Sequence, residues 1–196
     1  MIECVSADGT AIWPSVVFKR ARQNLEWGRD NPCDTRYATS NSNYYLLLTV
    51  SSISHSPKGW TDQELGSAWL ECDFKPTTAA RNKTGGYRLL ILDGHNSHTT
   101  YRFCSFVEKH KIIVLCLPPH TTHRLQPCNV RAFGPLNSTW KAEINLASQK
   151  YLEIRKNNLI SHYAKAREKA FMKSTIQNAF CKCGIWPFNP KAIKAM

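Results

Sequence analysis

The chain has 196 residues, enough for one domain with a real core but too few for two comfortable ones. Its formal net charge of +12 favours a polyanionic partner such as nucleic acid, although a basic surface without such a partner remains an alternative. The longest apolar cluster, residues 44–50, is far too short to cross a bilayer, and the first residues lack a signal-peptide pattern, so no membrane association is expected.

In the first half of the chain, MIECVSADGTAIWPSVVFK predicts two antiparallel strands joined at the turn-forming residues 7–9. Residues 21–57 have no sustained period, so we expect mostly loop, with one short strand at residues 44–50. Thr61, with Glu64 three residues later, predicts the start of a helix over TDQELGSAWLECDF. The polar stretch TTAARNKTGG is expected to be a linker.

In the second half, the apolar runs at residues 89–92 and 111–117 predict two strands buried on both faces of a sheet. A helix is expected between them at residues 99–109, and such a crossover makes the two strands parallel neighbours. Two amphipathic helices are expected downstream, at residues 129–155 and 161–180.

Asp93 directly follows the first of these apolar strands. Active-site groups collect at the carboxyl ends of strands in α/β sheets, so Asp93 is the best candidate for a metal-binding carboxylate. Gly94 allows a tight turn, and Ser97 could cap the helix that follows. The alternative is that Asp93 only caps a turn.

The eight cysteines are scattered, and none forms a CxxC pair. Several lie in apolar runs, as Cys116 does in IIVLCLPP, where a reduced thiol behaves as a small core residue. The pattern indicates a reducing compartment rather than a disulfide framework.

Several motifs together resemble one family. DGHNSH, LCLPPHTTHRLQPCNVRAFGPLN and GIWPFNP, preceded by SADGTAIWPSVVFK and GWTDQELGSAWL, are similar to the DDE superfamily endonuclease domain of pogo, Tigger and jerky-type transposases, which are related to centromere protein B. The resemblance implies one ribonuclease H-like domain over residues 1–196. Its α/β fold has a mixed sheet, flanked by helices, whose first three strands are antiparallel. The family's first strand would lie before this chain begins, which would expose a sheet edge.

The segment at about residues 22–57 departs from the family pattern. Within it, residues 41–56 carry YYLLLTVSS, which does not suit a functional loop, and we interpret them as an insertion or a retained intron. Sequencing the transcript across this region would reveal a shorter spliced form.

The resemblance also implies a site chemistry, in which three carboxylates hold two Mg²⁺ or Mn²⁺ ions for phosphodiester hydrolysis and strand transfer. Asp93 matches the second carboxylate, and the third position is Asn129, an amide. Losing one unit charge beside a divalent ion costs about 4 kcal/mol at 4 Å and an effective dielectric near 20, or about a thousandfold in rate. Glu143 is a poor replacement because it lies about 21 Å further along a helix.

The first carboxylate is also absent from the chain, so the resemblance implies a DNA-binding and catalytically inactive domain in the nucleus. One alternative is an active endonuclease completed by upstream residues or by a partner chain, which could be a second copy. Another is an interaction module in which the sheet serves only as a scaffold.

The expected DNA-binding residues are histidines and basic side chains near the matched motifs. The histidines could contact phosphate or orient Asp93, while a zinc site is the alternative. The basic residues between positions 141 and 173 could follow a DNA backbone or form a solvated face. The complete set comprises His95, His98, His120, His123, Arg124 and Lys141.

Overall fold

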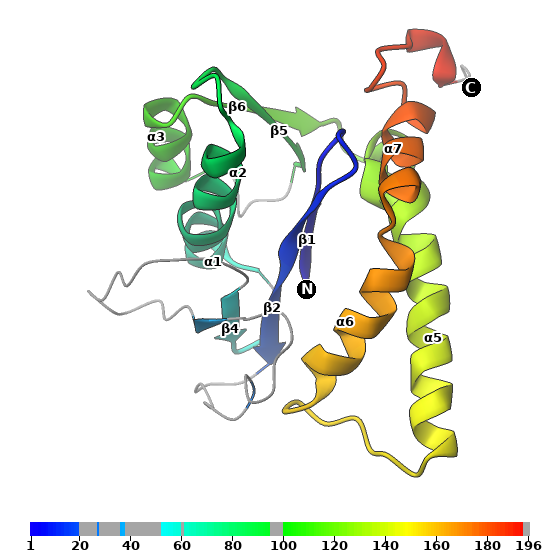
Figure 1. Ribbon diagram of the computed structural model, residues 1–196. Helices are drawn as coiled ribbons and strands as arrows, with labels where there is room; N and C mark the ends of the chain where they lie inside the picture. Colours follow the sequence, from blue (N-terminus) through cyan, green and yellow to red (C-terminus); the bar gives the residue numbers. More distant parts are fainter. Residues whose placement is uncertain (20–26, 28–35, 38–51, 60, 95–99, 194–196) are drawn as a thin grey trace. The chain divides into compact units, whose positions relative to one another are not determined.

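The computed structural model describes the whole chain except residues 20–26, 28–35, 38–51, 60, 95–99 and 194–196. The chain forms two compact units built from interleaved segments (Figure 1). Unit 1 comprises residues 1–2, 12–28 and 34–116, and unit 2 comprises residues 3–11, 29–33 and 117–196. None of the described helices has the length and apolar character needed to cross a membrane.

The part of the four-stranded sheet that belongs to unit 1 consists mainly of three parallel strands. β2, Ala11–Lys19, pairs with β4, Ser52–Ser56, which also pairs with β3, Arg36–Tyr37. Val16 lies opposite Ile53, and both side chains are buried, at 2% and 0% exposed. The expectation of loop was therefore wrong for residues 52–56, which form a strand. The resemblance implies antiparallel first strands and does not imply the parallel strands β3 and β4. The connection from β2 is long enough for the crossover that parallel pairing requires.

The helical part of unit 1 is longer than the sequence indicated. α1, Gln63–Trp69, continues through the π-helical turn η2, Leu70–Phe74, into α2, Lys75–Arg81. The N-cap is Asp62 rather than Thr61, because the Asp62 carboxylate accepts a 2.8 Å hydrogen bond from the Leu65 N–H. The first part of the predicted linker is thus helical, and only its end lies outside a helix.

The predicted strand, helix and strand around Asp93 are confirmed. β5, Arg88–Asp93, and β6, Ile112–Leu117, are neighbours in a two-stranded sheet, with α3, Tyr101–Lys109, between them in the chain. The Arg88 N–H donates to the Lys111 carbonyl at 3.0 Å, so the two strands start side by side, as parallel strands do. Burial on both faces was wrong, because Leu89, Ile113 and Leu115 are 58%, 52% and 49% exposed.

Unit 2 begins with most of β1, Ile2–Val5, and the turn that leads to β2, where the sequence predicted it. The Gly9 N–H donates to the Ser6 carbonyl at 2.9 Å, and the Ser6 N–H donates to the Thr10 carbonyl at 2.8 Å. Gly9 has φ of 89°, and a Cβ there would lie 2.4 Å from the Lys173 side chain. Only glycine therefore fits this turn without displacing α7.

The remaining elements of unit 2 that the structure describes are helices. Its elements are α4, Thr122–Leu125; η4, Cys128–Ala132; α5, Phe133–Gln149; α6, Leu159–Ala170; α7, Lys173–Lys182; and η5, Pro190–Ala192. The helix expected to reach residue 155 ends at Gln149. The helix expected over residues 161–180 is divided in two, because Met172 adopts an extended conformation.

The packing of α5 on α6 forms the main core of unit 2, and Figure 1 shows these two helices side by side. Leu136, Tyr163 and Ala170 are buried together, with Trp140 and Phe171 packed against them. The Trp140 and Tyr163 rings meet edge to face, with centroids 6.1 Å apart. The helices and small sheets of the two units together give the predicted class, a mixed α/β structure that is consistent with a ribonuclease H-like fold.

Candidate functional site

Asp93 is the last residue of β5 in unit 1, and its side chain is half-buried. The other end of β5 is fixed by Arg88, whose guanidinium donates to the Thr78 hydroxyl and the His110 carbonyl, both at 2.7 Å, and to the Lys75 carbonyl at 3.3 Å. Burial lowers the pKa of Arg88. These bonds tie the strand to α2 and to the end of α3, so Asp93 is carried by a strand that is well anchored at its start.

Asn129 lies in η4 of unit 2 and is exposed. Its side-chain amide nitrogen donates to the Gln126 side-chain oxygen at 2.6 Å, and its backbone N–H donates to the Gln126 carbonyl at 3.0 Å. The position that matches the third carboxylate therefore presents an amide whose orientation is set by Gln126.

The possible metal ligands at the positions that match the family's second and third carboxylates are one carboxylate, Asp93, and one amide, Asn129. Among the residues that the structure describes, no group of three or more His, Cys, Asp and Glu side chains could hold a metal ion. A two-metal centre of Mg²⁺ or Mn²⁺ needs more oxygen ligands with negative charge than this set provides. The described residues thus do not fit such a centre by themselves.

Glu143 cannot replace the missing carboxylate, because α5 and α6 enclose it. Its side chain is 7% exposed, and its Oε1 lies 2.8 Å from the His162 ring nitrogen Nδ1 on α6. An acidic side chain that is buried and paired in this way is not open to a ligand.

The other predicted contact residues that the structure describes lie in unit 2. His120, with φ of 62°, and His123, Arg124 and Lys141 are all exposed. Arg124 belongs to α4, and Lys141 lies on α5. His95 and His98 lie outside the described residues, so the structure does not place them beside Asp93.

A buried polar cluster around Glu3 in unit 2 was not predicted from the sequence. Glu3 on β1 is only 2% exposed at its side chain. Its carboxylate accepts two hydrogen bonds at 3.0 Å from Nε of Arg167 and one at 3.0 Å from Nη2, and the Tyr163 hydroxyl donates to it at 2.6 Å. The Arg167 guanidinium also lies 4.9 Å from the centre of the Phe171 ring. No local pattern could reveal a contact between residues 164 positions apart.

Two buried thiols accompany this cluster. Burial, followed by the nearby Glu3 carboxylate and Cys183, raises the pKa of Cys128 to about 12. Burial raises the pKa of Cys183 to about 11. Burial, followed by the charge of Glu3, also raises the pKa of Tyr163. No disulfide joins any two of the seven cysteines in the described part of the chain.

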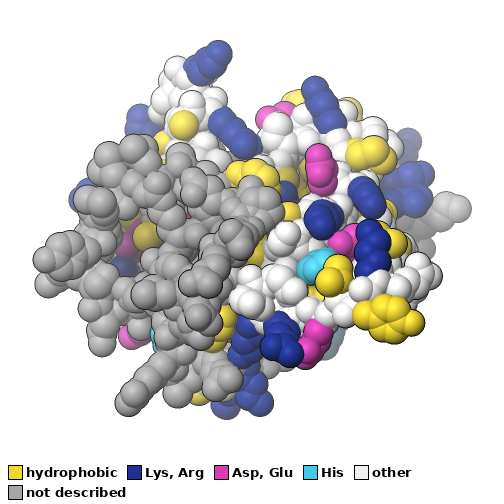
Figure 2. All heavy atoms as spheres, turned by 60° about the horizontal axis from the view of Figure 1, so that its bottom comes forward, with side chains coloured by type: hydrophobic (Ala, Val, Ile, Leu, Met, Phe, Trp, Pro, Cys, Tyr) yellow, Lys and Arg dark blue, Asp and Glu magenta, His cyan; other side chains and the backbone are white. Residues whose placement is uncertain are grey.

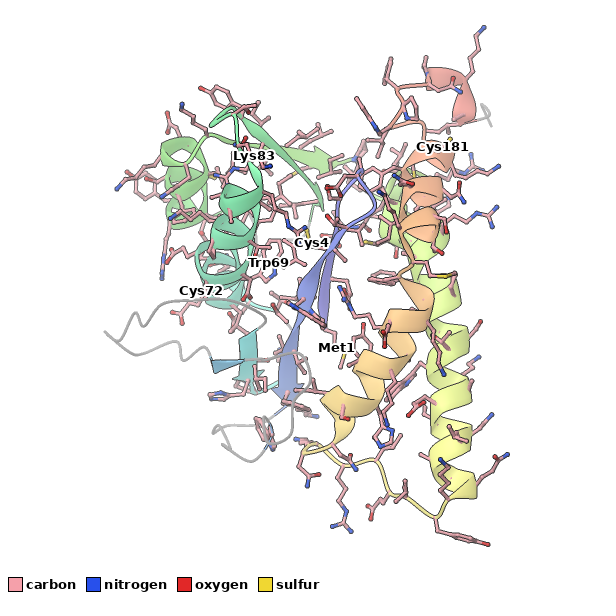
Figure 3. The ribbon with its side chains drawn as sticks, in the orientation of Figure 1. Met1, Cys4, Trp69, Cys72, Lys83 and Cys181 are labelled. Atoms are coloured by element: carbon pink, nitrogen blue, oxygen red, sulfur yellow. The ribbon has the colours of Figure 1, made fainter. Side chains whose placement is uncertain are left out.

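These thiols allow a simple labelling prediction. At pH 8 a thiol with a pKa of about 12 is ionised in roughly one molecule in ten thousand, and burial further blocks the reagent. Iodoacetamide should therefore modify the exposed Cys181, labelled in Figure 3, while Cys128 and Cys183 remain unmodified. Mass spectrometry of peptides, with a denatured sample as the control, measures this difference. Equal rates at Cys181 and Cys183 in the folded protein would contradict it.

The sequence is similar to a known protein family and to named proteins. The family described as DDE superfamily endonuclease matches residues 1–180. A Cochliobolus lunatus protein named MFS-type transporter clz9 is 30% identical over 195 residues, which is 98% of this chain and 19% of that protein. No solved structure matches the chain.

Two further relatives carry the name Pogo transposable element with KRAB domain, from Homo sapiens and Mus musculus. Each is 31% identical over 85 residues, or 43% of this chain and 14% of the relative. The chain thus spans a fifth or less of the length of these curated relatives, and the pogo-type resemblance predicted from the motifs is confirmed. With nearly its whole length matched, the chain belongs to the DDE superfamily endonuclease family.

Proposed function

We propose that this domain binds DNA in the nucleus and does not cleave it. The observation that carries the proposal is the distribution of charge. Residues 117–196, all in unit 2, hold thirteen Lys and Arg against three acidic residues, whereas residues 1–116 hold thirteen against eleven. Nearly all of the positive excess is therefore concentrated in one part of the molecule.

The few acidic groups in this basic part are largely engaged. Glu143 is buried against His162, and Glu153 is bonded to Arg155 at 2.6 Å. Figure 2, in which the lower end of Figure 1 is turned toward the viewer, shows Lys and Arg side chains over the described part of that face, with a few Asp and Glu side chains among them. Exposed cations with few competing anions attract a phosphate backbone without needing any particular base sequence.

The loss of cleavage rests on the matched carboxylate positions. Asn129 offers an amide where the third carboxylate belongs, and Glu143 is held elsewhere by His162. Without the anionic charge, metal ions that stabilise the attacking and leaving oxygens would be held too weakly for efficient phosphodiester chemistry.

The test of binding is a salt titration of a labelled DNA duplex followed by fluorescence anisotropy. The logarithm of affinity should fall linearly with the logarithm of salt, with a slope of about −0.9 per phosphate contacted. Lys141→Ala should make the slope shallower by about 0.9, because one contact is lost. Lys83→Ala, an exposed lysine of unit 1 labelled in Figure 3, is the matched control and should leave the slope unchanged. A slope near zero for the unaltered protein would exclude electrostatic DNA binding.

The second candidate function is an active endonuclease completed by residues of a longer protein or by a partner chain. It is favoured by the placement of Asp93 at the end of the anchored strand β5, and by the small share of its relatives that this chain covers. A nicking assay with Mg²⁺ or Mn²⁺ separates the two functions. Cleavage that disappears in Asp93→Ala would establish the second and overturn the first.

A further inference from the structure

The segment after α7 folds into a closed loop, Gly184–Asn189, which we call the terminal loop. The Asn189 N–H donates to the Gly184 carbonyl at 2.8 Å, and the Ile185 and Trp186 N–H groups donate to the Phe180 carbonyl at 3.2 and 3.4 Å. The Asn189 side-chain oxygen accepts from the Lys191 N–H at 3.0 Å and so caps η5. The loop is thereby tied to a helix on each side.

Gly184 is required at the start of this loop. Its φ is 67°, and a Cβ at this position would lie 2.2 Å from the Asn189 carbonyl oxygen. The closure of the terminal loop therefore depends on a glycine, and the backbone on either side of the loop is fixed by hydrogen bonds rather than free to vary.

This fixed loop presents two large rings to solvent. Trp186 is 62% exposed and Phe188 is 80% exposed, although aromatic side chains are normally among the main contributors to a core. Other apolar side chains close by in the chain do enter the core, since Ile176 and Phe180 of α7 are buried. The two rings are thus held outward by the loop, which indicates a surface that contacts something else.

The charge around the terminal loop indicates the kind of partner. Residues 169–196 contain five lysines and no acidic residue. Lys182 and Lys191, which stand on either side of the loop in the chain, are both exposed. Exposed aromatic rings among lysines suit a ligand that offers flat apolar faces and negative charge together, as unpaired nucleotides do. A neutral or basic protein surface would meet the same rings but would gain nothing from the lysines.

We propose that Trp186 and Phe188 stack on unpaired bases of single-stranded nucleic acid while the flanking lysines meet its phosphates. This deepens the proposed DNA binding and rests on it. Base stacking does not require a particular sequence, because every base has a flat face. The terminal loop would thus distinguish single-stranded from duplex DNA, a distinction that the cations alone do not make.

The test compares two labelled probes with the whole chain: a single-stranded oligothymidylate and a duplex of the same length. Trp186→Ala and Phe188→Ala should each weaken binding of the single strand by about 5- to 150-fold, the range for loss of one base stack. Duplex affinity should hardly change, and the salt slope should stay the same because no cation is removed. Trp186→Phe should recover most of the lost affinity, since a ring is restored.

Tyr151→Ala is the matched control, because Tyr151 is 98% exposed in unit 2 and lies outside the terminal loop. It should leave both affinities unchanged. Unaltered single-strand binding in Trp186→Ala, or an equal loss in Tyr151→Ala, would overturn the inference. A change in the protein's oligomeric state in Trp186→Ala, seen by size-exclusion chromatography without a change in single-strand affinity, would overturn it in favour of self-association. Absent duplex binding by the unaltered protein refutes the proposed function separately, because that probe does not depend on the loop.

Discussion

Arg167→Met should lower the free energy of unfolding by about 3–5 kcal/mol, because it leaves the buried Glu3 carboxylate without its cation. Three hydrogen bonds at 3.0 Å join the two side chains, and Glu3 is 2% exposed. Only the Tyr163 hydroxyl would remain among the bonds described for Glu3. Urea denaturation followed by circular dichroism measures the loss, with an unchanged m-value showing that only stability has altered.

Arg155→Met is the matched control, since Arg155 pairs with Glu153 and both side chains are 69% exposed. It should leave stability unchanged within error, because exposed ion pairs contribute little. The double variant Glu3→Leu with Arg167→Met should recover much of the loss, because no unpaired charge remains. Equal stability of Arg167→Met and the unaltered protein would show that the pair is not buried in solution.

Phe103→Ala should destabilise unit 1 by about 3–5 kcal/mol, the range for removing a large aromatic side chain from a core. Phe103 is 1% exposed and is one of the largest fully buried side chains of the described residues. It belongs to α3, which connects β5 to β6, so the loss should also loosen the strand that carries Asp93. Hydrogen exchange of the β5 amides measures this local effect alongside the urea midpoint.

Tyr101→Ala on the same helix is the control, because Tyr101 is 87% exposed. It should change stability by less than about 0.5 kcal/mol. A loss in Phe103→Ala no larger than that in Tyr101→Ala would mean that α3 does not contribute to the core of unit 1.

The parts of the fold that could be predicted are those with a strong local pattern. The apolar run before Asp93 gave β5 correctly, and the turn at Gly9 and the span of α3 were also correct. Strand β4 was missed because its sequence, SISHS, has one large apolar residue. Its burial comes from pairing with β2, a tertiary effect that local propensity does not contain.

The candidate site was predicted unevenly for a similar reason. A motif can identify Asp93 and Asn129, because their positions are fixed relative to neighbours in the chain. It cannot show that Glu143 is held by His162, or that Glu3 is held by Arg167, because these partners are 19 and 164 residues away. The exposure of Trp186 and Phe188 was equally hidden, since apolar residues are expected inside until the loop geometry is known.

The distance between Glu3 and Arg167 along the chain sets an order of events during synthesis. At roughly 5–20 residues per second, Arg167 emerges about 8–30 s after Glu3, which is 164 residues ahead of it. Until then the Glu3 carboxylate on β1 lacks the Arg167 guanidinium with which it is buried in the folded protein. Unit 2 therefore has to complete its folding after most of the chain is made, and the newly made first strand is exposed to aggregation for the whole of that interval.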